Sequence, residues 1–148
     1  MVVTMTAYTI ERHNVPTKEL EDFVRAEGPE LYKRFGQTFS FDSMDLKVMM
    51  DRGLFLVCKR NGEIRGWMIA FLTKSPLDTN IKILQQQSFF VIPDSGRTAY
   101  HLFKKFIDIG KEEADHIITM LTSQTNIKPE TLNKLGFKEL ETLYRLEV

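Results

Sequence analysis

One stretch of the chain constrains the fold most strongly: residues 88–106, SFFVIPDSGRTAYHLFKKF. An apolar run ends at Pro93, a turn of small residues follows, and an amphipathic pattern begins directly after it. Apolar side chains then recur at the i, i+3, i+4 and i+7 spacing of one helix face. The stretch therefore predicts a strand, a tight turn around Gly96 and Arg97, and a helix that begins near Arg97. A helix N-terminus reached through such a turn presents backbone amides that suit a phosphate group.

The clearest β signal is the dipeptide Asn61-Gly62 between the apolar runs LFLVCKR and EIRGWMIAFLTK. Both positions of a tight two-residue hairpin turn require a positive φ angle, which Asn and Gly tolerate. We therefore expect two antiparallel strands joined at this dipeptide. Further strands are predicted over residues 2–12 and 81–92 and in the segments HIITMLTS and FKELETLYRLEV.

Helical periodicity predicts several further helices. In TKELEDFVRAEG, Leu20, Phe23 and Val24 share one face, and the following Gly28-Pro29 predicts the end of this helix. Short helices are also expected in the segments PELYKRFG, SMDLKVMMDRG and KPETLNKL.

The resulting order of elements is a strand, two or three helices, a hairpin, and then β, α, β, α and β. Antiparallel strands early in the chain and a βαβ unit late in it predict an α+β fold with a mixed sheet. No internal repeat and no linker rich in Pro, Gly or Ser divides the 148 residues. We therefore expect a single domain over residues 1–148.

Composition narrows the classes of function. The 20 basic and 20 acidic side chains balance, which argues against a protein whose overall field binds nucleic acid or an anionic membrane. No stretch approaches the roughly 18 apolar residues of a membrane span. The N-terminus lacks the pattern of a signal peptide, and the single cysteine, Cys58, fits a reducing compartment and a half-buried structural role. These features predict a cytoplasmic protein.

In element order and in two local motifs, the chain resembles the GNAT superfamily of acetyl-coenzyme A-dependent N-acetyltransferases. The first motif, VIPDSGRTAYHLF, is similar to the strand end, pyrophosphate loop and helix of that family. The second, NIKPETLNKLGFKEL, is similar to its late asparagine, short helix and Leu-Gly-Phe before the last strand. The resemblance implies the GNAT fold, a mostly antiparallel central sheet flanked by helices.

The resemblance also implies acetyl transfer from acetyl-coenzyme A to an amine, carried by a small molecule or by a protein. The backbone around Phe90, Val91 and Ile92 would pair with the pantetheine arm of the cofactor. The start of the next helix would face the pyrophosphate, where Arg97 could add a charge-assisted contact. The remaining cofactor-binding residues implied by the resemblance are Gly96, Thr98, Ala99 and Asn126.

The chain departs from the family pattern in four respects. Asp94 stands where a basic residue is expected, and the loop is shorter than in common versions. The strand over residues 81–92 contains no Asp or Glu to serve as the base, and Leu132 stands where the family has a tyrosine acid. No catalytic residue is therefore assigned from the sequence, and no Cys or His spacing indicates a metal site.

A second hypothesis follows from these departures. The protein could have kept the fold and lost catalysis, and then serve as a binding or structural module. Shortened loops of this kind also resemble those of GNAT-like proteins of tailed bacteriophages, including internal virion proteins. This alternative predicts a homo-oligomer, a host protein or a virion component as the partner, and a location in the bacterial host cytoplasm or in the virion.

Overall fold

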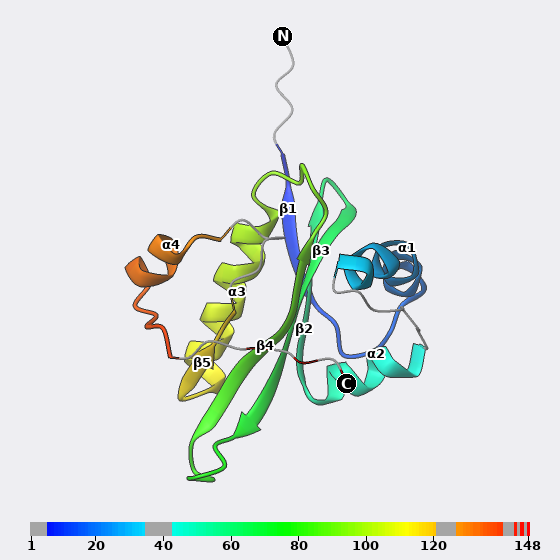
Figure 1. The fold of residues 1–148 in the computed structure, drawn as a ribbon. Coiled ribbons are helices and arrows are strands. Elements are labelled where there is room, and N and C mark those ends of the chain that lie inside the picture. The colour runs from blue at the N-terminus through cyan, green and yellow to red at the C-terminus, as the bar shows by residue number, and fades with distance from the viewer. Residues whose placement is uncertain (1–5, 35–42, 121–126, 141–143, 145, 147) are drawn as a thin grey trace.

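The computed structural model describes residues 6–34, 43–120, 127–140, 144, 146 and 148, and its centre is a five-stranded mixed sheet (Figure 1). The strands lie in the order β1-β2-β3-β4-β5, and only the β4–β5 pair is parallel. Their bounds are β1 Tyr8–Arg12, β2 Gly53–Arg60, β3 Glu63–Lys74, β4 Lys82–Val91 and β5 His116–Ile118.

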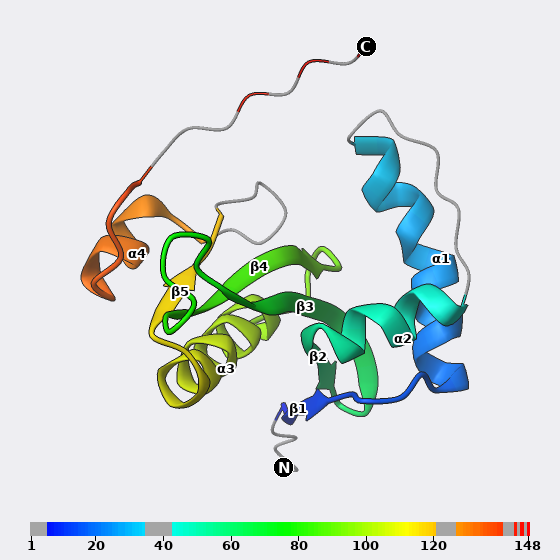
Figure 2. The same cartoon turned by 90° about the horizontal axis from the view of Figure 1, so that it is seen from below.

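Helices cover both faces of the sheet, as Figure 2 shows. Helices α1 (Lys18–Arg34) and α2 (Ser43–Asp51) lie on one face, and α3 (Thr98–Glu113) and α4 (Pro129–Lys134) lie on the other. The predicted α+β architecture with a mixed, mostly antiparallel sheet is thus confirmed. No helix in the described ranges is both long and apolar enough to cross a membrane.

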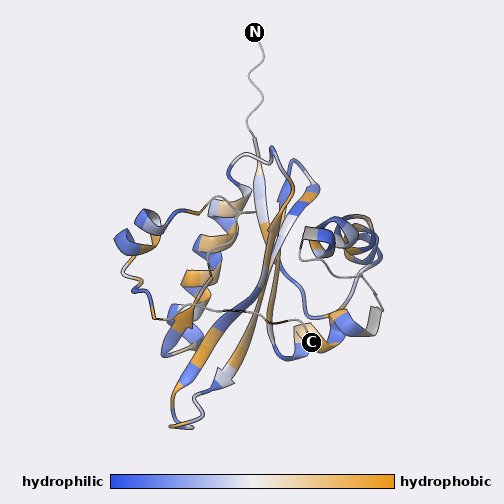
Figure 3. Ribbon diagram, viewed as in Figure 1, coloured by the Kyte–Doolittle hydropathy of each residue, from blue (hydrophilic) through white to orange (hydrophobic). Residues whose placement is uncertain are grey.

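Two hydrophobic clusters, one on each face, hold the helices against the sheet. On β2, Leu54, Leu56 and Cys58 belong to the cluster beneath α3, whereas Phe55 and Val57 belong to the cluster beneath α1 and α2. Successive strand residues point to opposite faces, so a strand covered on both sides must be apolar throughout. This requirement accounts for the uninterrupted run LFLVC, and Figure 3 shows the apolar strands between the helical layers.

The predicted hairpin is confirmed. Asn61 and Gly62 have φ angles of 52° and 84°, as a two-residue turn of this kind requires, and Arg60 pairs with Glu63 across it. The helix predicted to begin near Arg97 begins at Thr98 and runs to Glu113.

The predicted end of the first helix at Gly28-Pro29 is wrong, because α1 continues to Arg34 with Pro29 inside it. Leu20, Val24 and Leu31 are all buried in the same cluster beneath α1. Their spacing of four and seven residues keeps one helical face against the sheet on both sides of the proline. Burial of that face therefore overrides the local tendency of proline to end a helix.

The C-terminal prediction is also wrong for the residues that the structure describes. Phe137–Leu140, Tyr144, Leu146 and Val148 lie in no strand, and the last three side chains are fully exposed. Among the described residues, the sheet consists of β1 to β5 and includes none of these residues. The strand predicted in HIITMLTS ends at Ile118, and its residues 121–123 lie outside the described ranges, as do residues 2–5 of the first predicted strand.

Candidate cofactor site

The turn between β4 and α3 is closed by hydrogen bonds among its own residues. The hydroxyl of Ser95 donates to the carbonyl of Ile92, and the hydroxyl of Thr98 donates to the carbonyl of Ser95 at 2.7 Å. Both side chains are buried, at 4% and 0% exposure. Asp94 and Gly96 each have a φ of 61°, a left-handed conformation that Gly adopts freely and Asp tolerates. The turn is therefore compact and defined by its own sequence.

The N-terminus of α3 carries three amides without an acceptor in the described part of the chain. The amide of Arg97 donates to the hydroxyl of Tyr8 at 2.9 Å, and that of Thr98 donates to the carbonyl of Ser95 at 3.3 Å. Among the described residues no acceptor lies on the amides of Gly96, Ala99 and Tyr100. Such orphan amides, together with the positive end of the helix dipole, suit an anion such as a diphosphate.

The predicted residues of this segment therefore divide into two groups. Gly96 and Ala99 present amides that are free to bind a ligand, whereas the amides of Arg97 and Thr98 are bonded within the protein. The guanidinium of Arg97 lies over the ring of Tyr100, 4.5 Å from its centroid. The Tyr100 amide was not among the cofactor-binding groups expected from the sequence, although the rule that the first turn of a helix leaves its amides unpaired would have included it.

The edge of β4 that faces β5 is paired along only part of its length. The described residues of β5 pair with Ile83, Leu84 and Gln85, and the pairing stops there. The amide of Ile92 donates to the carbonyl of Arg65 on β3 at 2.8 Å. Backbone groups alternate along a strand, so the polar groups of Val91 face the opposite edge, which no described strand pairs with at this position. That edge leads directly to the turn before α3.

Of the residues predicted for this edge, Phe90 and Val91 are buried, with 2% and 8% exposure, and Ile92 is half-buried. Phe90 and Val91 pair with Trp67 and Gly66 on β3. The predicted cofactor residue Asn126 lies outside the described ranges.

Gln86 occupies the point where β4 and β5 separate. Its side chain is 1% exposed, and its Oε1 accepts hydrogen bonds from the hydroxyl of Thr119 and from the amide of Met120 at 3.3 Å. The register with β3 shifts beside it, which leaves Gln87 as an extra residue on β4. Gln86 therefore links the two strands through its side chain where their backbone pairing has ended.

The two positions at which the resemblance implies a base and an acid carry neither group. Strand β4 carries no Asp or Glu, and the Gln86 amide cannot accept a proton at neutral pH. Leu132 packs against the core cluster beneath α3. Burial, followed by the positive charges of Arg97 and Lys104, lowers the pKa of His101, which favours its neutral form.

Cys58 is not a nucleophile of this site. Its side chain is 0% exposed, and burial raises the pKa of its thiol to about 11, so the thiolate is scarce at neutral pH. The cysteine expected to be half-buried is therefore fully buried, as part of the core cluster beneath α3. Within the described ranges, no group of three His, Cys, Asp or Glu side chains could hold a metal ion.

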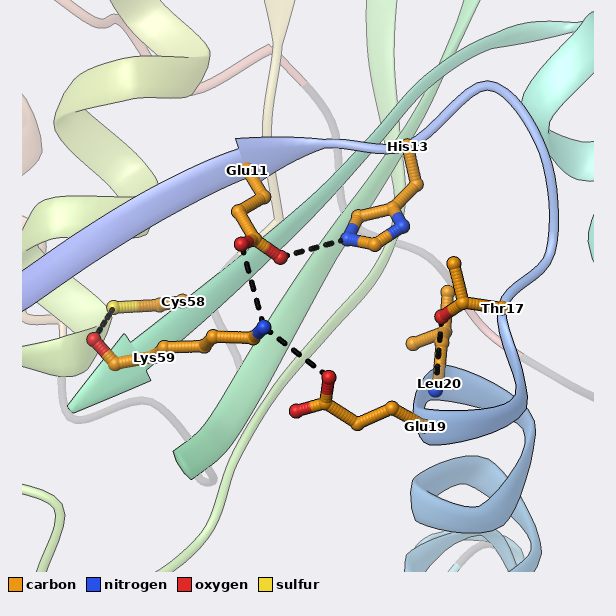
Figure 4. A network of polar contacts seen from close by, with 7 residues as sticks. All are labelled: Glu11, His13, Thr17, Glu19, Leu20, Cys58 and Lys59. Carbon is orange, nitrogen blue, oxygen red and sulfur yellow. Dashed lines mark hydrogen bonds and ion pairs between the residues drawn. The ribbon is translucent and has the colours of Figure 1, made fainter. Parts of the chain in front are cut away.

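A separate polar network joins β1, β2 and α1, as Figure 4 shows. The Lys59 ammonium lies 3.2 Å from a Glu19 oxygen and 3.3 Å from a Glu11 oxygen, and Glu11 also contacts the His13 ring at 3.1 Å. Burial favours the neutral form of Glu11, but the hydrogen bonds from His13 and Lys59 outweigh it and lower the pKa of Glu11. The network uses its charges to attach the start of α1 to the sheet.

Comparison with solved structures shows that the fold is that of GNAT-type acetyltransferases. A probable acetyltransferase superposes with a TM-score of 0.69 at 16% identity, over 95% of this chain and 97% of that one. An aminoglycoside acetyltransferase from an uncultured soil metagenomic sample, in complex with sisomicin, gives 0.67 at 10% identity and 95% coverage of both chains. A predicted acetyltransferase from Clostridium acetobutylicum, with acetyl-CoA, gives 0.63 at 13% identity, over 97% of this chain and 96% of that one. No family model and no curated protein matches the sequence.

Proposed function

We propose that the protein transfers an acetyl group from acetyl-coenzyme A to an amine acceptor. One observation carries the proposal: the part of the β4 edge left unpaired by the described residues leads directly to three amides at the start of α3 that have no acceptor among those residues. An extended pantetheine arm needs backbone partners along a strand edge, and a diphosphate needs several converging amides. The similarity to acetyltransferase structures supports this assignment of the site, since one of those proteins was determined with acetyl-CoA.

The residues present fit such a cofactor without rearrangement of the turn. The amides of Gly96, Ala99 and Tyr100 would bind the diphosphate, and the exposed guanidinium of Arg97 would add positive charge beside it. The β4 edge at Val91 would orient the pantetheine arm. When bound, acetyl-coenzyme A would supply the activated thioester that the acceptor amine attacks.

Loss of the acceptor proton is the step for which β4 offers no side chain. We infer that the amine arrives unprotonated or releases its proton to water, because β4 contains no carboxylate. This mechanism favours acceptors with a low amine pKa, and the rate should rise with pH until the acceptor is fully unprotonated. The aminoglycoside acetyltransferase of similar fold makes aminoglycosides a reasonable first acceptor to assay, beside polyamines and lysine peptides.

The assay measures release of coenzyme A and the mass of the acetylated product with each amine. The proposal predicts acceptor-dependent release in the native protein and its loss in Arg97→Glu. Release that is independent of every amine tried, in a protein that still binds acetyl-coenzyme A, would refute acetyl transfer to those acceptors.

Two observations favour a second candidate, a binding or structural module that has kept the fold and lost catalysis. At the point where β4 and β5 separate, Gln86 places a neutral amide that links the two strands. Leu132, at the position of the implied tyrosine acid, packs against the core cluster beneath α3. This candidate predicts cofactor binding without turnover, or a stable homo-oligomer, host protein or virion component as its partner. A bacteriophage source and a cytoplasmic or virion location stay predictions from the sequence.

A further inference from the structure

A cavity of about 370 Å³ lies at the end of the β2–β3 hairpin, and it is lined by Arg60, Asn61, Glu63 and Arg65. It is open to solvent and carries two positive charges and one negative charge. The hairpin end and the turn before α3 lie at the same end of the sheet (Figure 1). Both arginines also contact that turn, so the cavity adjoins the candidate cofactor site.

A β-bulge places Arg65 in this position. Cys58 pairs with Gly66 and Lys59 pairs with Ile64, so Arg65 is an extra residue on β3. A bulge bends the strand and redirects the side chain of the extra residue. Arg65 accordingly reaches the turn, where its Nε donates to the hydroxyl of Ser95 at 2.9 Å and its Nη2 donates to the carbonyl of Pro93 at 3.3 Å.

Arg60 reaches the same turn from β2. Its Nη1 donates to the carbonyl of Asp94 at 3.3 Å. A Cβ built on Gly96 would lie 3.4 Å from the Arg60 Cζ, so the guanidinium lies directly against the turn that carries the free amides. The Arg60 Nε is buried and has no hydrogen-bond partner among the described residues.

The contacts with the turn leave N–H donors and the positive charge of both guanidinium groups available for a ligand. Each guanidinium has five N–H donors, and the contacts with the turn use one in Arg60 and two in Arg65. Those contacts are to neutral oxygens, and no carboxylate of the described residues forms an ion pair with either arginine. Paired guanidinium forks match the geometry and the charge of a phosphate.

We propose that Arg60 and Arg65 bind a phosphate group in this cavity. The inference explains how the turn could bind a charged ligand although Asp94 stands where a basic residue is expected: the hairpin supplies the positive charge instead. The assignment of this phosphate to acetyl-coenzyme A rests on the proposed function. Free inorganic phosphate or diphosphate has the same chemistry and is the other source.

Calorimetric titrations of acetyl-coenzyme A, its 3′-dephospho form and inorganic pyrophosphate test the inference. The proteins compared are the native chain, Arg60→Gln, Arg65→Gln and the control Arg52→Gln. The control removes a charge from an arginine that lies over Phe71, at the end of the hairpin strands opposite the Asn61-Gly62 turn. We expect each of the first two substitutions to weaken acetyl-coenzyme A binding at least tenfold, and the control to leave it unchanged. Arg60→Lys and Arg65→Lys keep the positive charge and should therefore recover part of the affinity. If the arginines only braced the turn through forked hydrogen bonds, the Lys variants would bind no better than the Gln variants.

The outcomes separate the inference from the proposed function. If the Gln variants weaken the intact cofactor but not its dephospho form, the arginines bind the 3′-phosphate; equal weakening of both forms assigns them the diphosphate. If only pyrophosphate binds, and binds through these arginines, the phosphate site stands and the proposed cofactor fails. If the native protein binds acetyl-coenzyme A and both Gln variants bind it with unchanged affinity, the inference about the arginines is overturned and the proposed function stands. If none of the three probes binds the native protein, both the inference and the proposed function are overturned.

Discussion

The hydroxyl of Tyr8 accepts a hydrogen bond from the backbone amide of Arg97 at 2.9 Å. This bond joins the first described strand to the start of α3 across 89 positions of sequence. The Tyr8 ring also packs on the ring of His101, with 4.5 Å between the centroids. Tyr8 therefore fixes the position of the helix N-terminus and satisfies one of its amides, which leaves the neighbouring amides for a ligand.

Replacing Tyr8 with Phe should lower the free energy of unfolding by about 1 kcal/mol, the usual net contribution of one hydrogen bond. Urea denaturation measures the change. Tyr144→Phe is the matched control, because that side chain is 92% exposed. Equal stability of the two variants would show that the Tyr8–Arg97 bond contributes nothing to the fold.

Replacing Gly96 with Ala should destabilise the turn for two reasons. The φ of 61° disfavours any Cβ by roughly 1–2 kcal/mol, and a Cβ at this position would overlap the Tyr8 hydroxyl. Gly62→Ala is the control, because Gly62 has a φ of 84° and open space around it. Gly96→Ala should therefore cost more than Gly62→Ala in urea denaturation.

The overlap with Tyr8 can be isolated by a double substitution. In Tyr8→Phe the hydroxyl is absent, so adding Gly96→Ala should then cost less than it does in the native background. Purely additive free energies would contradict the close contact of Gly96 with the Tyr8 hydroxyl.

Replacing Gln86 with Leu should cost about 1–3 kcal/mol, because Gln86 is buried and the substitution leaves the Thr119 hydroxyl and the Met120 amide without their acceptor. Gln87→Leu, at the neighbouring exposed position, should change the stability little. Thermal and urea unfolding compare the two. A smaller loss in Gln86→Leu than in Gln87→Leu would remove the proposed link between β4 and β5.

Burial of the Cys58 thiol makes the stability depend on pH. The unfolded thiol loses its proton near its ordinary pKa of 9.0, and the folded thiol does so near 11. Its contribution to stability is therefore complete below pH 9 and declines as the pH rises toward 11. Between about pH 8 and about pH 10.5 the unfolded thiol loses its proton while the folded thiol largely keeps it. Over this range the free energy of unfolding should fall more in the native chain than in Cys58→Ala. Identical pH profiles for the two proteins would contradict the raised pKa.

The parts of the fold that follow from local sequence were predicted correctly. Asn61-Gly62 dictates its own φ angles, and the periodicity after Arg97 dictates one helix face, so neither depends on distant residues. The continuation of α1 through Pro29 was not predicted, because it depends on the burial of Leu31 against the sheet. The absence of a strand over Phe137–Leu140 likewise depends on a partner strand, which local sequence does not specify.

In the candidate site too, the features set by local sequence were predicted, and the contacts between distant residues were not. The turn itself was found from its residues, and Gly96 and Ala99 do present free amides. The partners of that turn come from β1, β2 and β3, and nothing near Tyr8, Arg60 or Arg65 in sequence indicates where their side chains lie. Contacts made across the sheet at such separations require the register of the strands, including the bulge at Arg65.

Calorimetric titration with acetyl-coenzyme A tests the proposed cofactor site directly. We expect one binding site per chain, with affinity strongly reduced in Arg97→Glu and unchanged in Lys74→Glu, which makes the same charge change at the exposed end of β3. Binding should also raise the midpoint of thermal unfolding, since the ligand stabilises the folded state. If the titration gives no heat of binding and millimolar cofactor gives no thermal shift, the assignment of the β4 edge and the α3 amides as an acetyl-coenzyme A site is contradicted.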